Sequence, residues 1–383
     1  MHLLRTLPGL RARGLAVEIF VLSGRGVLID SMRETGVPVV TPAITRFLSA
    51  NRSSFGRFFL LAGLVPELIW RLLWLRSSIV HFYLPESYCL AGPIAVLLGI
   101  RTKLMSRRSQ NAYHALKPPI FARLERWLHQ RMTVISGNSE RIIMELFSDE
   151  GVPRDKLILL RNGVTVSELP TDGRRAQIRT ELLIEPSSVA LVIVANLIPY
   201  KGHIDLLEAL ALLTVDRDWN VLVLGADAIG YRIVLERCAE VLGIADRTRF
   251  LGETADVGRV LDGCDIGVLC SHEEGFSNAL LEYMERALPV VATAVGGNIE
   301  AVVDRGTGLL VPPKQPRDLA EALEKLIIDK ELCHRLGAAG RDRAISLFGQ
   351  DASMQAYARL YRSLLQGYGV SADFMPPDVP PNC

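Results

Sequence analysis

Short apolar runs alternate with longer segments of helical periodicity along most of the chain. Such alternation is typical of parallel α/β structure. In the first half we predict strands at residues 15–23, 77–84, 101–109, 131–139 and 156–163. In the second half we predict strands at residues 188–197, 219–226, 247–252, 265–271 and 289–297. Each run ends in polar or turn residues, so the sequence predicts two doubly wound sheets.

A polar segment divides these sheets between two domains. At 383 residues the chain exceeds the size at which a single hydrophobic core stops growing. Residues 165–177 are polar and include Pro170 and Gly173, so we place the hinge there. The predicted domains are 1–170 and 171–349, followed by a helix at 350–366 and a disordered, proline-rich tail at 367–383.

The net charge of +1 hides an asymmetry between the two halves. Residues 1–165 hold 22 Lys and Arg against 11 Asp and Glu, whereas residues 166–383 hold 21 against 31. The basic half favours an anionic partner such as a phosphate-bearing lipid, a membrane surface or nucleic acid. The alternative is that these cations are scattered over a solvated surface.

One apolar segment, residues 58–75, approaches the composition of a membrane span. It contains Pro66, Glu67 and Arg71, and its longest uninterrupted apolar run is far below the roughly 20 residues that a span needs. After Pro66 the leucine spacing predicts an amphipathic helix. This helix belongs either to the protein core or to a membrane interface.

Two other classes of site lack their motifs. The six cysteines show no metal-binding spacing and lie mainly in apolar runs, which is typical of reduced thiols in a cytosolic protein. No G-x-G-x-x-G fingerprint follows a predicted strand, so an NAD-binding protein is disfavoured.

Candidate binding residues follow the strands of the second half, at the sheet edge where open α/β sheets bind ligands. The stretch "ANLIPYKGH" leaves a strand at Asn196 and brings Lys201 and Gly202 to the start of a helix. A lysine beside the positive end of a helix suits a phosphate. Taken alone, a Lys-Gly pair at a strand-to-helix turn favours an ordinary surface turn.

A second stretch, "EEGFSNALLE", is more informative. Gly275 permits unusual backbone angles, and the amides of Phe276, Ser277 and Asn278 then open a helix and form a cradle for a diphosphate. The carboxylates of Glu274 and Glu282 stand on either side of that cradle, where each can accept hydrogen bonds from sugar hydroxyls. The alternative is that both are ordinary acids at a helix start and on its solvated face.

The run "EGFSNALLEYMERALPVVATAVGG" resembles the signature of the retaining glycosyltransferases of family four, with its E-x7-E pair at Glu274 and Glu282. Other family segments occur in order: "ISGNSERI" (135–142), "LLRNGV" (159–164), "ANLIPYKGH" (195–203), "FLGETADVGRVLDGCDIGVLCS" (250–271) and "LFGQDASMQAYARLYRSLL" (347–365). A nucleotide-sugar epimerase shares the overall fold but is expected to lack the E-x7-E stretch.

The resemblance implies a GT-B fold, in which a first Rossmann-like domain binds the acceptor, a second binds the donor, and the last helix crosses back to the first. It assigns the nucleotide ribose to Glu282 and the donor sugar to Glu274. It further assigns Lys201 and the amides of Phe276, Ser277 and Asn278 to the diphosphate, Phe250 and Leu251 to the base, and the Gly296–Gly297 turn to the neighbourhood of the donor.

The implied reaction moves a sugar with retention, and cationic groups rather than a metal or another cofactor stabilise the departing diphosphate. Where relatives have an arginine this chain has Asn196, so Lys201 bears more of that charge. The first-domain loop reads "SRRSQNAYH" in place of the usual histidine, so Arg107 or Arg108 supplies the cation there. We predict that His114 lies on a helix surface.

The start of the chain departs from the family. Relatives open with a strand and a glycine-rich loop, whereas "MHLLRTLPGLRARG" has the pattern of the helix that follows them. The first domain is therefore predicted to be truncated at its N-terminus, because Met1 is an internal start or because the chain is a relic.

Two functions of different classes follow. The first is an enzyme of cell-surface polysaccharide or glycolipid synthesis that transfers a sugar from a UDP- or GDP-linked donor to a glycan or lipid-linked acceptor. We expect it in the cytoplasm, in peripheral contact with the anionic inner face of the membrane and without a nucleic-acid partner. The second is a relic that binds a sugar nucleotide without turnover.

Overall fold

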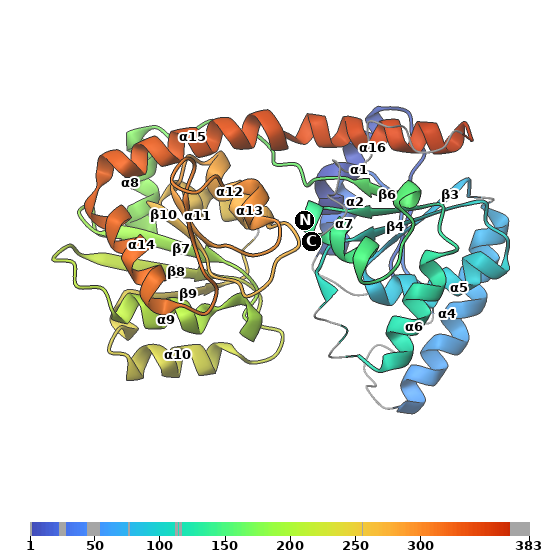
Figure 1. Cartoon of the computed structure of the whole chain (residues 1–383), viewed down its shortest axis with the longest axis horizontal. Helices are drawn as coiled ribbons and strands as arrows, with labels where there is room; N and C mark the ends of the chain where they lie inside the picture. Colours follow the sequence, from blue (N-terminus) through green and yellow to red (C-terminus); the bar gives the residue numbers. More distant parts are fainter. Residues whose placement is uncertain are drawn as a thin grey trace. The chain divides into compact units, whose positions relative to one another are not determined.

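The described chain folds into two compact units (Figure 1). The computed structural model describes residues 2–22, 28–43, 54–75, 77–111, 114, 117–254 and 256–367. Unit 1 runs to Gly163 and resumes at Gln350, and unit 2 is Val164–Gly349. Apart from Gly367, the tail predicted to be disordered lies outside the described residues.

The units meet at Gly163 and Val164 rather than after residue 170, because the intervening segment is held by unit 2. The backbone N–H of Val164 donates to the carbonyl of Phe348 at 2.8 Å. The N–H of Ser167 donates to Glu285 Oε1 at 2.5 Å, and its carbonyl accepts from Arg341 Nη2 at 2.7 Å. These partners lie far along the sequence, so the polar composition of the segment alone placed the predicted boundary too late.

Unit 2 contains a six-stranded parallel sheet in the order β12-β11-β10-β7-β8-β9. Its strands are β7 (Val189–Val194), β8 (Trp219–Leu224), β9 (Thr248–Gly252), β10 (Ile266–Leu269), β11 (Val290–Thr293) and β12 (Leu309–Val311). Its helices are α8 (Asp172–Glu181), α9 (His203–Ala211), α10 (Arg232–Val241), α11 (Val257–Asp262), α12 (Asn278–Glu285), α13 (Asn298–Ala301), α14 (Pro316–Ile328) and α15 (Lys330–Phe348).

Helices cover both faces of this sheet, as a doubly wound fold requires. One hydrophobic cluster joins the sheet to α9, α10 and α14, and a second joins the opposite face to α11, α12 and α15 (Figure 1). Because both faces are covered, the strands are near-continuous apolar runs. That composition is the reason why they could be recognised in the sequence.

Unit 1 contains a four-stranded parallel sheet in the order β3-β4-β5-β6 and a separate parallel pair, β1-β2. Its strands are β1 (Ile19–Phe20), β2 (Val39–Val40), β3 (Ile79–Tyr83), β4 (Thr102–Arg107), β5 (Val134–Gly137) and β6 (Leu157–Leu159). Its helices are α1 (His2–Ala12), α2 (Leu28–Glu34), α4 (Ser54–Trp74), α5 (Pro85–Leu97), α6 (Pro119–His129), α7 (Glu140–Ser148) and α16 (Gln350–Leu365).

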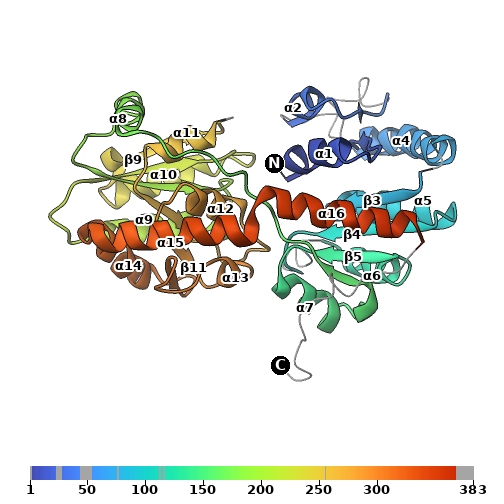
Figure 2. The same cartoon turned by 90° about the horizontal axis from the view of Figure 1, so that it is seen from above.

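The last helix, α16, lies beside α1 and against β3 (Figure 2). The α/β architecture with two parallel, Rossmann-like sheets is thus confirmed. Two short strands, β2 and β12, were not predicted, because each is a brief apolar run beside a proline. Among the residues that the structure describes, no helix is long and apolar enough to cross a membrane.

A buried ion-pair network lies inside unit 1. The side chain of Arg107 is 1% exposed, and its Nη2 lies 2.9 Å from Glu150 Oε2 and 3.7 Å from Glu125 Oε2. His129 Nε2 lies 2.7 Å from the same Glu150 oxygen, while its Nδ1 is 3.0 Å from the hydroxyl of Tyr88. Burial acts to raise the pKa of Glu150, but the hydrogen bond from His129 and the charge of Arg107 hold it below its usual value.

Replacing Arg107 by Gln should destabilise unit 1 by roughly 3–5 kcal/mol, because two carboxylates remain buried without their cation. The matched control is Arg126→Gln, an exposed arginine on α6 whose loss should change stability by less than about 0.5 kcal/mol. Urea unfolding followed by circular dichroism measures both. Equal stability of the two variants would contradict the network's structural role.

Candidate functional site

The candidate site lies on two loops that leave the same edge of the unit 2 sheet. The strand order reverses direction between the neighbours β7 and β10, and ligands bind at such switch points, beyond the carboxyl ends of the strands. The loop after β7 leads to Lys201, and the loop after β10 leads to Glu274. Predicted site residues separated widely in the sequence are therefore brought together here.

The loop after β7 packs tightly against the end of β10. Pro199–Lys201 forms a single 3₁₀ turn, and Gly202 follows with a left-handed φ of 71° before α9 begins at His203. A Cβ on Gly202 would lie only 2.0 Å from the carbonyl oxygen of Cys270. Only glycine satisfies both the backbone angle and the lack of space.

An ion pair joins the two loops. Lys201 Nζ lies 2.5 Å from Glu274 Oε1, and the same oxygen accepts a hydrogen bond from Ser271 Oγ at 2.8 Å. The two charged side chains are 17% and 10% exposed, so water screens this pair less than it would a surface pair. The pair places a cation and a carboxylate side by side at the mouth of the site.

A second pair beside it was not predicted. His272 Nε2 lies 2.7 Å from Asp205 Oδ2 in the first turn of α9. The backbone N–H of His272 also donates to the carbonyl of Tyr200 at 2.7 Å. His272 therefore fastens the turn that bears Lys201 to the second loop. Its position directly after a predicted strand was the available signal, but its partner cannot be read from the sequence.

The predicted cradle lies at the start of α12. Ser277 caps this helix by accepting from the backbone N–H of Leu280 at 3.3 Å, and Asn278 is its first residue. Phe276 is buried and packs on Phe348, with 5.2 Å between ring centroids. Glu282 lies half-buried one turn further along the helix.

The Gly296–Gly297 turn rests on this cradle. The N–H of Gly297 donates to the carbonyl of Gly275 at 3.0 Å, and a Cβ on Gly297 would lie 2.3 Å from that oxygen. Gly296 has a positive φ of 48°. Because neither glycine has a side chain, the backbone of this turn can lie close to the start of α12.

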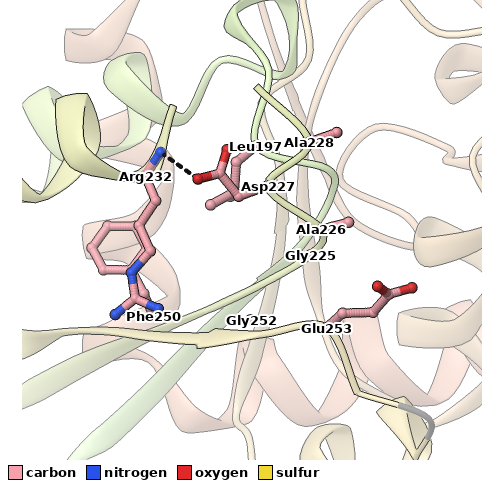
Figure 3. Close-up of a pocket in the computed structure, with 9 residues that line it drawn as sticks. All are labelled: Leu197, Gly225, Ala226, Asp227, Ala228, Arg232, Phe250, Gly252 and Glu253. Carbon is pink, nitrogen blue, oxygen red and sulfur yellow. Dashed lines mark hydrogen bonds between the residues drawn. The ribbon is translucent and has the colours of Figure 1, made fainter. Parts of the chain in front are cut away.

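A cavity of about 340 Å³ opens at the carboxyl ends of β7, β8 and β9 (Figure 3). Phe250 forms one wall, and the guanidinium of Arg232 lies over its ring with its carbon 5.6 Å from the centroid. Leu251 packs on the opposite face of the sheet, so of the predicted base-binding pair only Phe250 lines the cavity. Leu197, from the loop that leads to Lys201, also lines the cavity.

Asp227 also lines this cavity and was not predicted, although it follows directly after a predicted strand. Its carboxylate accepts from the backbone N–H groups of Tyr231 and Arg232 at 2.7 and 3.2 Å and so caps α10. The predicted residue Asn196 is exposed at the end of β7. Within the described ranges, no three His, Cys, Asp or Glu side chains are grouped so as to hold a metal ion.

The predicted cations of unit 1 differ in their surroundings. Arg107 points into the buried network, whereas Arg108 is half-buried beyond the end of β4, with its Nη2 2.5 Å from Asn162 Oδ1. His114, predicted on a helix surface, has 3₁₀-helical backbone and a side chain that is 21% exposed. Its Nε2 lies 2.5 Å from the buried Glu125, so the ring also contacts the buried network.

Gly202→Ala should lower the free energy of unfolding by several kcal/mol, because it adds a steric overlap to a strained backbone angle. Gly243→Ala is the matched control, since Gly243 has a φ of 70° but nothing within 4 Å of an added Cβ. The control should lose only about 1–2 kcal/mol. Urea titrations of both variants give the difference, and similar losses would show that the close approach to Cys270 does not matter.

The stability of unit 2 should fall in acid through His203. Burial and the nearby Lys201 lower the pKa of this 2%-exposed residue to about 4, against an ordinary value of about 6.5. Between pH 6.5 and 4 the unfolded chain binds a proton that the folded chain does not. Falling pH therefore lowers the free energy of unfolding by up to about 3 kcal/mol.

His203→Gln should remove that part of the acid sensitivity, while the exposed His334→Gln should keep all of it. Unfolding free energies at pH 7 and 4.5 measure the difference. An unchanged pH dependence in His203→Gln would contradict the assignment.

Comparison with known proteins identifies the family of this chain. Residues 1–163 match the family model described as a glycosyl transferase 4-like domain, and residues 174–343 match that of the glycosyl transferases group 1. The N-acetyl-alpha-D-glucosaminyl L-malate synthase of Bacillus anthracis is 25% identical over 288 residues, which cover 75% of this chain and 74% of the relative.

A D-inositol 3-phosphate glycosyltransferase of Streptomyces bingchenggensis is 31% identical over 246 residues, 61% of this chain and only 53% of the relative. Among solved structures, Anabaena Alr3699/HepE in complex with UDP-glucose superposes with a TM-score of 0.82 at 19% identity, covering 94% of both chains. The fold is that of the GT-B glycosyltransferases, and the chain belongs to the glycosyl transferases of group 1.

Proposed function

We propose that this chain transfers a sugar, with retention at the anomeric carbon, from a nucleotide-sugar donor to a glycan or lipid-linked acceptor in cell-surface polysaccharide or glycolipid synthesis. The main support is the Lys201–Glu274 pair, 2.5 Å apart at the sheet switch point, together with a cavity of about 340 Å³ that Leu197 of the same loop lines. A cavity of this size is in the range of small-ligand sites. In the proposal the reaction takes place at the cytoplasmic face of the membrane.

Each part of the donor has a partner in this proposal. The base enters the cavity against Phe250, and the ribose hydroxyls donate to Glu282. The diphosphate contacts Lys201 and the N–H groups at the start of α12, where the helix dipole favours negative charge. The sugar hydroxyls donate to Glu274. The positive charge of Lys201 offsets the repulsion between the Glu274 carboxylate and the diphosphate.

The proposed reaction breaks the bond between the anomeric carbon and the diphosphate oxygen and forms one from that carbon to the acceptor oxygen on the same face. The acceptor proton passes to the departing phosphate. Lys201 and the α12 amides stabilise the growing negative charge, so that the proposal requires no metal ion. We assign the additional cation of unit 1 to Arg108, because Arg107 is already paired inside the network.

The donor need not be UDP-linked, but the complex of HepE with UDP-glucose makes UDP the first choice for this chain. The alternative function remains a protein that binds a sugar nucleotide without turnover. The names of two relatives include L-malate and D-inositol 3-phosphate. A search for turnover should therefore test both compounds as small acceptors.

UDP or UDP-glucose should stabilise the chain against heat, and GDP or ADP should do so less. At a hundred times its dissociation constant a ligand adds about 2.7 kcal/mol, or roughly 5–11 degrees in melting temperature. Glu282→Ala should remove most of the shift, and the exposed control Glu240→Ala should keep it. If no nucleotide shifts the folded chain, the donor site is refuted.

Turnover then separates the enzyme from the non-catalytic alternative. Transfer is supported if UDP is released from UDP-glucose in the presence of an acceptor. Retention is supported if NMR shows that the product keeps the anomeric configuration of the donor. Nucleotide binding without release over the whole acceptor panel supports the alternative.

A further inference from the structure

The segment that follows β10 contacts the turn that bears Lys201 at several points. Cys270 Sγ donates to the carbonyls of Lys201 and Gly202, at 3.4 and 3.1 Å. Ser271 Oγ donates to Glu274 Oε1, the same oxygen that pairs with Lys201. Consecutive residues of one loop therefore contact both the backbone that bears the lysine and the carboxylate that faces its ammonium group.

His272 extends these contacts across the whole turn. Its backbone N–H donates to the carbonyl of Tyr200, the residue immediately before Lys201, at 2.7 Å. Its ring Nε2 lies 2.7 Å from Asp205 Oδ2, in the first turn of α9. Since an ionised carboxylate only accepts hydrogen bonds, Nε2 carries the proton that it donates. One residue thus contacts the segment 200–205 on both sides of Lys201.

The position of the lysine charge depends on these neighbours. The lysine side chain is a flexible four-carbon stem, so the backbone and the side chains around it decide where its ammonium group lies. Lys201 Nζ lies over the ring of Tyr200, 5.2 Å from the centroid, as well as beside Glu274. The side chains of His272 and Asp205 are only 25% and 17% exposed, so water has limited access to the hydrogen bond between them.

We propose that His272 is a positioning residue that holds Lys201 in place for the diphosphate of the donor. The inference rests on the proposed function, in which Lys201 binds that diphosphate. Loss of the bond to Asp205 releases one side of the turn, and a ligand must then order the turn as it binds. Phosphate recognition weakens, while the cavity that takes the base is unaffected. A ring that only stabilised the first turn of α9 would change stability without this selectivity.

The test compares His272→Asn with His272→Gln in the full chain. The glutamine amide nitrogen lies near the place of Nε2 and can donate to Asp205, whereas the shorter asparagine cannot reach it. In calorimetric titrations His272→Asn should bind UDP roughly threefold to tenfold more weakly than the parent chain, and His272→Gln should stay within about twofold. Uridine, which has no phosphate, should bind both variants as it binds the parent when followed by ligand-observed NMR.

Further variants separate positioning from an independent effect. Added to Lys201→Met, His272→Asn should weaken UDP by less than about twofold more, because no ammonium group remains to be held. Asp205→Ala removes the same hydrogen bond from its other partner and should give the same selective loss, so it decides the matter if His272→Asn does not fold. The matched control is His334→Asn, an exposed histidine on α15, which should bind UDP and uridine as the parent does.

Two results overturn the inference while the donor site stands. In the first, Lys201→Met weakens UDP binding but both His272→Asn and Asp205→Ala bind UDP as the parent does. In the second, the affinities for UDP and uridine fall equally, as a general structural effect requires. If Lys201→Met leaves UDP binding unchanged, or the folded parent binds no UDP, the proposed donor site is itself refuted, and the inference falls with it.

Discussion

The site depends on one close backbone approach, that of Gly202 to the carbonyl of Cys270. Because Gly202 has no Cβ, the turn after β7 can lie directly on the end of β10. Lys201 can then reach Glu274, and His272 can reach both Asp205 and the carbonyl of Tyr200. Residues about 70 positions apart are thus joined by direct hydrogen bonds. A cation and a carboxylate held in this way need little reorganisation when a charged ligand arrives.

Much of this arrangement could be predicted because it follows from local patterns. Apolar runs identified the buried strands, and the residues after each run identified Lys201 and Glu274. Their contact could not be predicted, because periodicity does not encode which strands are neighbours. The Asp205–His272 pair was missed for the same reason. Leu251 was wrongly grouped with Phe250 in the cavity, since successive strand residues point to opposite faces.

The arginine residues of unit 1 have different surroundings and different roles. Arg107 and Arg108 are consecutive, yet Arg107 neutralises buried carboxylates and Arg108 faces Asn162 beyond the strand end. The sequence offered no way to choose between them, because the partners come from segments about 40 and 54 residues away. Arg131 has a third kind of surrounding, because its guanidinium lies over the ring of Trp127, 4.1 Å from the ring centroid. The asymmetry of charge is therefore only partly a surface property.

The most direct test is calorimetric titration of UDP and UDP-glucose into the parent chain, Lys201→Met, Glu274→Gln and the double variant. If Lys201 binds the diphosphate and Glu274 the sugar, Lys201→Met weakens UDP tenfold or more, consistent with loss of a charged hydrogen bond worth about 1.5–3 kcal/mol. Glu274→Gln then leaves UDP within about threefold but removes any preference for UDP-glucose. Unchanged UDP affinity in Lys201→Met would contradict the assignment of the donor to this ion pair.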